Sequence, residues 1–123
     1  TDLYREIIFD HFRLPHHAKA LAEPYQTHTT TNEACGDVAQ VQVRIVNNRI
    51  EDIAVLSEGC AVNIAACSVL SELVIGKSKA RARSTTKEKL LAALGITPNP
   101  SRLRCALLGL ETLHELLDEK NPR

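Results

Sequence analysis

The chain has 123 residues, of which 44% are hydrophobic and 24% are charged. This length suits one domain with a real core, and the composition excludes a largely disordered chain. Fifteen Lys and Arg residues balance fifteen Asp and Glu residues, so no overall field attracts nucleic acid or anionic lipid. We therefore expect a single domain over residues 1–123 that binds neither nucleic acid nor a membrane.

We expect neither a membrane-spanning segment nor a signal peptide in these residues. A transmembrane helix needs about 18 consecutive apolar residues, and Asp2, Glu6 and Asp10 stand where a signal peptide would be apolar. We expect a cytoplasmic protein. Its four cysteines should then be reduced, as metal ligands, catalytic thiols or buried side chains.

The first half of the chain predicts one helix followed by three strands. Apolar residues at helical spacing predict a helix over residues 2–14, which Pro15 ends. A loop over 16–24 leads to strands that we place at 25–31, 38–46 and 50–56. Asn47 and Asn48 tolerate a positive φ, so the last two strands should form a tight hairpin.

The second half predicts helices only. A mostly apolar helix should begin after Gly59 and end at Gly76, and a short one should cover 86–94. Ser101 is the expected N-cap of a final helix that runs to Leu117. These elements predict an α+β fold, with a helix first and a three-stranded antiparallel sheet that carries the helices on one face.

Three of the cysteines fall at the predicted ends of these elements. Cys35 and Asp37 flank a glycine in the turn between the first two strands, where they offer two ligands side by side. Cys60 begins the buried helix, whose amide donors and positive end stabilise a thiolate. The spacings fit no short zinc-finger pattern, so a joint site and scattered cysteines both remain open at this point.

Cys105 is the third cysteine at an element end, whereas Cys67 has different surroundings. Cys105 is expected in the first turn of the final helix, where Arg102 and Arg104 should lower the pKa of its thiol. Cys67 lies inside the apolar helix and is expected to fill core space, outside the range of any metal. A thiol oxidoreductase that uses Cys60 and Cys67 is disfavoured, because the two thiols are two helical turns apart and too distant for a disulfide.

Four segments resemble the U-type iron-sulfur cluster assembly proteins, the group of IscU, SufU and the NifU N-terminal domain. Residues 3–12 are similar to the opening helix of that family. The stretches 32–37, 58–62 and 100–106 are similar to its three cysteine motifs, in the same order. The resemblance covers nearly the whole chain and implies a SufE/NifU-like fold.

The resemblance also implies a site. Carried over residue by residue, it consists of Cys35, Asp37, Cys60 and Cys105, which hold Zn²⁺ or a [2Fe-2S] cluster. The implied function is to accept persulfide sulfur from a cysteine desulfurase, with Cys105 as the reactive thiol, and to assemble or relay a cluster or sulfur. Downstream partners would be apo iron-sulfur proteins or cluster carriers.

Some features leave the subtype and the activity open. Arg104 resembles the SUF-type branch, while the short segment from Lys77 to Cys105 resembles the Isc-type length. The chain would then be a scaffold or a zinc-dependent sulfurtransferase rather than an enzyme with small-molecule turnover. The alternative is a structural zinc module that recruits a partner, although Asp37 is unusual in a closed structural site.

The histidines and the basic segment carry weaker signals. His11 is expected to be a surface or packing residue, and the other four histidines are expected to be solvated. The segment 77–89 is rich in Lys and Arg, which suits a solvated face or a docking surface for an acidic partner.

Overall fold

The computed structural model describes residues 2–34, 36–95 and 100–118. A helix, α1 (Asp2–Arg13), precedes a three-stranded antiparallel sheet in the order β1-β2-β3. The strands are β1 (Gln26–Asn32), β2 (Asp37–Val46) and β3 (Arg49–Glu58). Asn47 and Asn48, with φ values of 53° and 64°, form the predicted tight turn between β2 and β3.

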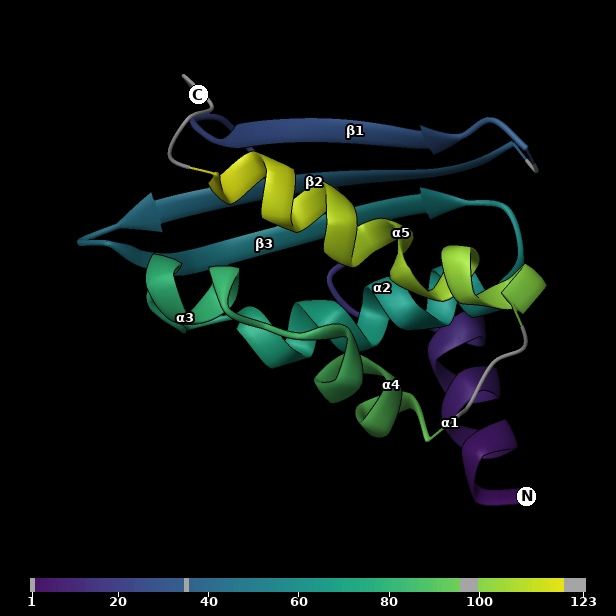
Figure 1. Ribbon diagram of the computed structural model, residues 1–123. Helices are drawn as coiled ribbons and strands as arrows, with labels where there is room; N and C mark the ends of the chain where they lie inside the picture. The colour runs from purple at the N-terminus through teal and green to yellow at the C-terminus, as the bar shows by residue number, and fades with distance from the viewer. Residues whose placement is uncertain (1, 35, 96–99, 119–123) are drawn as a thin grey trace.

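Four helices follow the sheet: α2 (Ala61–Val74), α3 (Lys79–Arg83), α4 (Lys87–Leu94) and α5 (Pro100–Leu117). Figure 1 shows α5 crossing one face of the sheet, with α2 beside it and α1 against α2. This arrangement confirms the predicted α+β fold with the helix first. No helix in the described part of the chain is long and apolar enough to cross a membrane.

The core lies between the sheet and the two longest helices. Val41 and Val43 of β2 are fully buried, because alternate side chains of a strand point to the same face. They pack in one apolar cluster with Leu70 of α2 and with Leu113 and Leu117 of α5. The helix α2 is buried over most of its surface, which explains why its sequence lacks polar alternation.

Two details differ from the prediction. The helix α5 begins at Pro100, a residue favoured in the first helical turn, so Ser101 lies inside the helix and is not its N-cap. Cys105 is consequently in the second turn. The short helix α3 was not predicted, because its five residues carry no clear apolar period, although Ser78 caps it by accepting a hydrogen bond from the Arg81 N–H.

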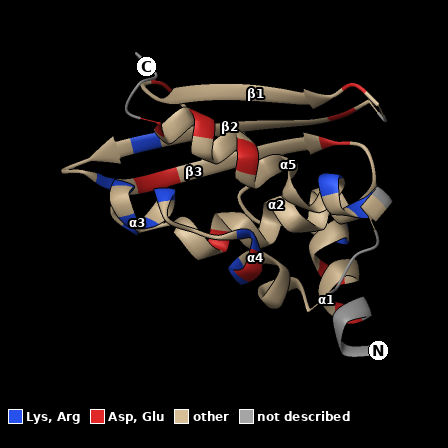
Figure 2. Cartoon of the chain, in the orientation of Figure 1, with Lys and Arg blue, Asp and Glu red and all other residues tan. Residues whose placement is uncertain are grey.

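Basic residues lie around α3 on the left side of the view in Figure 2. Blue ribbon covers much of α3 and the neighbouring ends of β2 and β3. The exposed Arg81 and Arg83 of α3 belong to the basic segment 77–89, so its position at the surface agrees with either a solvated face or a docking surface.

Candidate metal centre

Three potential ligands meet at one end of the sheet. Asp37 is the first residue of β2, Cys60 immediately precedes α2, and Cys105 lies in α5. A carboxylate oxygen of Asp37 and the two Sγ atoms all lie within 4.8 Å of one another. Ligand atoms around a tetrahedral zinc ion are separated by about 3.8 Å when the Zn–S bonds are about 2.3 Å. The observed group is therefore compact enough for one ion.

Asp37 is 3% exposed. Its Oδ1 accepts a hydrogen bond from the backbone N–H of Cys60 at 3.3 Å, while its buried Oδ2 has no hydrogen-bond partner within the described ranges. An unpaired buried carboxylate oxygen is costly in free energy and calls for a compensating cation. The oxygen and the two thiols form a donor set that fits zinc or an iron-sulfur cluster.

The burial of Asp37 corrects a sequence-based expectation. Its position after Gly36 in a turn predicts an exposed side chain with little packing. The side chain is instead enclosed, because the end of β3 and the start of α2 lie directly against it. Gly36 has φ +80°, and a Cβ added to it would meet no atom within 4 Å, so it supplies the turn without covering the aspartate.

Gly59 allows this close approach. Its φ is +125°, and a Cβ atom placed there would lie 2.0 Å from Asp37 Oδ1 and 2.4 Å from Asp37 Cγ. Side chains cannot occupy that space, so glycine is needed both for the backbone conformation and for the room it leaves. The junction of β3 and α2 can therefore bring the backbone of Cys60 into contact with Asp37.

Asn63 also stabilises the junction of β3 and α2. It is completely buried, and its Nδ2 donates to the Glu58 carbonyl at 3.1 Å and to the Val38 carbonyl at 3.3 Å. These bonds tie the first turn of α2 to the ends of β2 and β3. Sequence reasoning gave Asn63 no role, since its partners are backbone groups that only the folded sheet brings to it.

The environment of Cys105 differs from the prediction. Burial, together with the nearby Cys60 and Asp37, raises the pKa of the Cys105 thiol to about 12. Arg102 and Arg104 are both exposed and do not offset this effect. In the metal-free site Cys105 is therefore a protonated thiol, and binding of a cation must release its proton.

Cys67 is buried in the core and is not part of the group of ligands, as predicted. Its Sγ lies 3.5 Å from Asn63 Oδ1. Burial raises the pKa of the Cys67 thiol from an ordinary value of 9.0 to about 12. Cys35, the fourth predicted ligand, lies outside the described residues.

The raised pKa of Cys67 predicts alkaline destabilisation. Between pH 9.0 and about 12 the unfolded thiol has lost its proton and the native thiol retains it. The unfolded state then binds fewer protons, so the free energy of unfolding should fall as pH rises through this window. Urea unfolding of the metal-free protein at several pH values measures the fall, which should be smaller in Cys67→Ala. An equal fall in both proteins would contradict it.

Three of the histidines expected to be solvated make hydrogen bonds to distant parts of the chain, although His17 is exposed as predicted. His28 Nε2 lies 2.8 Å from a Glu115 carboxylate oxygen, and His114 Nε2 lies 2.9 Å from the Thr85 carbonyl. His17 Nδ1 is 2.9 Å from Ser71 Oγ. Each partner is at least 29 positions away along the chain, so the sequence around a histidine did not reveal it.

The comparison with protein families agrees with this geometry. The family model of the NifU-like N-terminal domain matches residues 3–119, which is nearly the whole chain. The chain therefore belongs to the family of NifU-like N-terminal domains.

Relatives and a solved structure extend this result. The chain is 35% identical over 113 residues to the iron-sulfur cluster assembly scaffold protein IscU of Aquifex aeolicus, covering 90% of this chain and 71% of that protein. It is 25% identical over 130 residues to the zinc-dependent sulfurtransferase SufU of Bacillus subtilis, covering 92% and 88%. A crystal structure of a SUF-system scaffold candidate from Fervidobacterium islandicum has the same fold, with a TM-score of 0.79, 22% identity and coverage of 92% and 95%.

Proposed function

We propose that this protein is an iron-sulfur cluster assembly scaffold whose site consists of Cys35, Asp37, Cys60 and Cys105. The observation that carries the proposal is the convergence of Asp37, Cys60 and Cys105, whose ligand atoms lie within 4.8 Å of one another, together with a buried Asp37 oxygen that has no hydrogen-bond partner among the described residues. The membership in the NifU-like family and the name of the Aquifex aeolicus relative support the same function.

The cargo of this site is a [2Fe-2S] cluster or zinc. Soft thiolates bind both, and the harder carboxylate oxygen of Asp37 binds either one less tightly than a fourth thiolate would. Zinc, when bound, would stabilise the thiolate forms of its cysteine ligands at neutral pH. The name of the Bacillus subtilis relative supports the zinc form.

The sulfur that enters the site comes from a cysteine desulfurase as a persulfide. Cys105, which would be held as a thiolate when the site carries its cation, attacks the outer sulfur; a new S–S bond forms, and the bond between that sulfur and the desulfurase cysteine breaks. The electron pair of the broken bond leaves on the desulfurase thiolate, so the step needs no external oxidant. Downstream apo iron-sulfur proteins or cluster carriers then receive the sulfur or the cluster.

The burial of Cys105 sets a condition on this step. Its side chain is 5% exposed, so the attack requires the thiol to become accessible while Asp37 and Cys60 stay in place. The carboxylate is suited to this, because Asp37 accepts the Cys60 backbone N–H and remains anchored when Cys105 departs.

Cys105→Ser should abolish persulfide acceptance and leave the fold intact. Serine is close in size to cysteine, but its hydroxyl does not attack a persulfide at neutral pH. The measurement is the turnover of a cysteine desulfurase in the presence of each protein. Cys67→Ala is the matched control, since it removes a buried thiol outside the ligand group and should stimulate turnover as the unaltered protein does.

Stimulation by Cys105→Ser equal to that of the unaltered protein would move the acceptor role to Cys35 or Cys60. Metal and sulfide analysis of protein purified without oxygen tests the cargo separately. Brown protein with iron and sulfide supports the cluster scaffold, whereas colourless protein with one zinc supports sulfur transfer. A protein that holds zinc but never stimulates a desulfurase would be the structural zinc module.

A further inference from the structure

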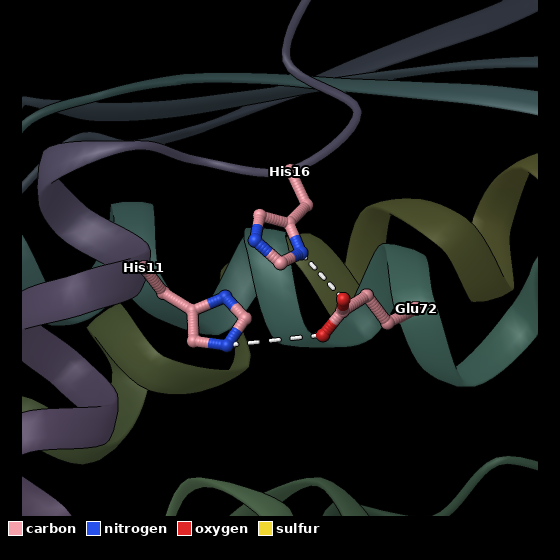
Figure 3. A group of neighbouring side chains, drawn as sticks. All are labelled: His11, His16 and Glu72. Carbon is pink, nitrogen blue, oxygen red and sulfur yellow. Dashed lines mark hydrogen bonds and ion pairs between the residues drawn. The ribbon is translucent and has the colours of Figure 1, made fainter.

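Two histidines and a glutamate meet near the far end of α2. His11 comes from α1, His16 from the loop that follows it, and Glu72 from the last turn of α2 (Figure 3). One nitrogen of each ring and one carboxylate oxygen lie within 4.8 Å of one another. Twelve residues separate Glu72 from Cys60, which corresponds to about 18 Å along a helix. This group is therefore distinct from the cysteine site.

The two rings approach different oxygens of the same carboxylate. His16 Nδ1 forms a short hydrogen bond with Glu72 Oε2, and His11 Nε2 lies 3.8 Å from Glu72 Oε1. Figure 3 shows both ring nitrogens turned toward the carboxylate. The rings themselves are close, with centroids 4.7 Å apart. Three potential ligand atoms from three separate segments of the chain thus lie close together.

Ser68 orients the ring of His11. Its buried Oγ lies 2.7 Å from His11 Nδ1 and accepts the backbone N–H of His16 at 2.7 Å. One lone pair of Oγ remains to accept the Nδ1–H of His11. In that tautomer Nε2 has a free lone pair on the side of Glu72, which is the arrangement that metal-binding histidines adopt when their other nitrogen donates to a protein group.

The loop that carries His16 is also fixed. The carbonyl of His17 accepts the backbone N–H of Val55 at 2.8 Å, and His17 Nδ1 lies 2.9 Å from Ser71 Oγ. These two contacts of His17 attach the loop to β3 and α2 directly beside His16. The three donors are therefore held together by the fold before any ion binds, which lowers the entropy cost of binding.

The group has access to solvent on one side. The side chains of His16 and Glu72 are 48% and 44% exposed, while that of His11 is 15% exposed. An ion can reach them, and water can occupy the remaining coordination position. Two imidazoles, one carboxylate and an open position form a donor set that suits zinc and other divalent first-row transition metals.

We propose that His11, His16 and Glu72 form a second metal site, which binds a divalent transition metal such as Zn²⁺ at the surface between α1 and α2. The site uses only nitrogen and oxygen ligands, so its affinity does not depend on the state of the cysteines. The proposal goes beyond the scaffold function and stands independently of it.

The test is a zinc titration of protein without a polyhistidine tag, followed by calorimetry and by NMR of the imidazole nitrogens. We expect the His11 and His16 signals to shift as zinc is added. Glu72→Gln and His16→Gln should weaken this binding at least about tenfold, the lower end of the loss seen when only an outer-shell partner of a metal is removed. Both side chains are exposed, so neither change should affect folding.

Glu115→Gln is the matched control. Glu115 also pairs with a histidine, His28 at 2.8 Å, but it belongs to neither group of potential ligands found in the described residues. Its loss should leave zinc binding unchanged. If Glu72→Gln bound zinc as tightly as Glu115→Gln, or if the two histidine signals failed to move at about 1 mM zinc, the group would be only a hydrogen-bonded contact between α1 and α2.

Cys60→Ser separates this proposal from the scaffold function. It removes a ligand of the cysteine site and leaves the histidine signals responsive to zinc. Loss of the histidine response in Cys60→Ser, with the fold retained, would show that the two sites are not independent and would overturn the proposal. A protein that fails in desulfurase assays but keeps the histidine response would contradict the scaffold function alone.

Discussion

Gly59→Ala should destabilise the metal-free protein by about 3 kcal/mol or more and prevent tight zinc binding. Two costs combine in this change. A side chain at φ +125° is strained by about 1–3 kcal/mol. The new Cβ would also lie 2.0 Å from Asp37 Oδ1, so either the aspartate or the start of α2 must move. Urea unfolding and a zinc titration of the same variant measure the two effects.

Gly76→Ala is the matched control for this prediction. Gly76 has φ +77°, and its added Cβ would meet no atom within 4 Å. The free energy of unfolding of this variant should therefore fall only by the cost of a left-handed backbone, about 1–2 kcal/mol. The variant should bind zinc normally. Equal losses of stability in the two variants, with zinc binding retained in both, would mean that the close approach of Gly59 to Asp37 has no role in the site.

Local sequence signals were sufficient to predict most of the fold. The Asn47-Asn48 pair adopts the positive φ values that its hairpin requires. Cys60 lies at the junction of β3 and α2, as predicted. A β-branched stretch followed by glycine and an apolar run indicates such a junction without any knowledge of tertiary contacts. These features depend on neighbours within a few residues and were predictable, whereas the short helix α3 and the first residue of α5 were not.

The surroundings of the site side chains were not predictable in this way. For Cys105 the adjacent Arg102 and Arg104 suggested a lowered pKa, but burial beside Cys60 and Asp37 raises it. Those two neighbours lie 45 and 68 positions earlier in the sequence. The sign of a pKa shift depends on which charges and how much solvent surround a group in space, and sequence adjacency does not determine either.

The same reason explains the group around Glu72. Asp10 precedes His11 in the sequence, but the carboxylate that contacts both His11 and His16 belongs to Glu72, more than 50 positions away. Only the packing of α1 on α2 brings the three together. An i to i+5 pair of histidines across the end of a helix was the one signal available, and alone it is not specific for a metal.

Asp37→Ala should change the release of the cargo far more than the stability of the metal-free protein. Two effects on folding oppose each other. The variant loses the hydrogen bond from the Cys60 N–H, and it also loses a buried carboxylate oxygen that has no partner within the described ranges. Net changes should stay within about 1 kcal/mol. Removal of zinc by a chelator should become at least about tenfold faster, since a direct ligand contributes no less than an outer-shell partner.

Asp52→Ala is the matched control for the charge. Asp52 is a half-exposed aspartate of β3 that pairs with Arg44 at 3.5 Å, away from the cysteines. It removes the same charge from the chain but no ligand, so zinc release should keep its original rate. Asp37→Asn adds a second comparison, because it keeps the size of the side chain and an oxygen that can accept the Cys60 N–H while removing the negative charge.

The three variants together distinguish the possible roles of Asp37. Fast release from both Asp37→Ala and Asp37→Asn identifies the charged oxygen as the ligand that controls exchange. If the alanine variant failed to fold without metal while the asparagine variant folded, the aspartate would chiefly hold the start of α2 through Cys60. If both folded and released zinc at the original rate, the three cysteines with water or another side chain would hold the metal, because a ligand that leaves no trace in the release rate is not bound to it.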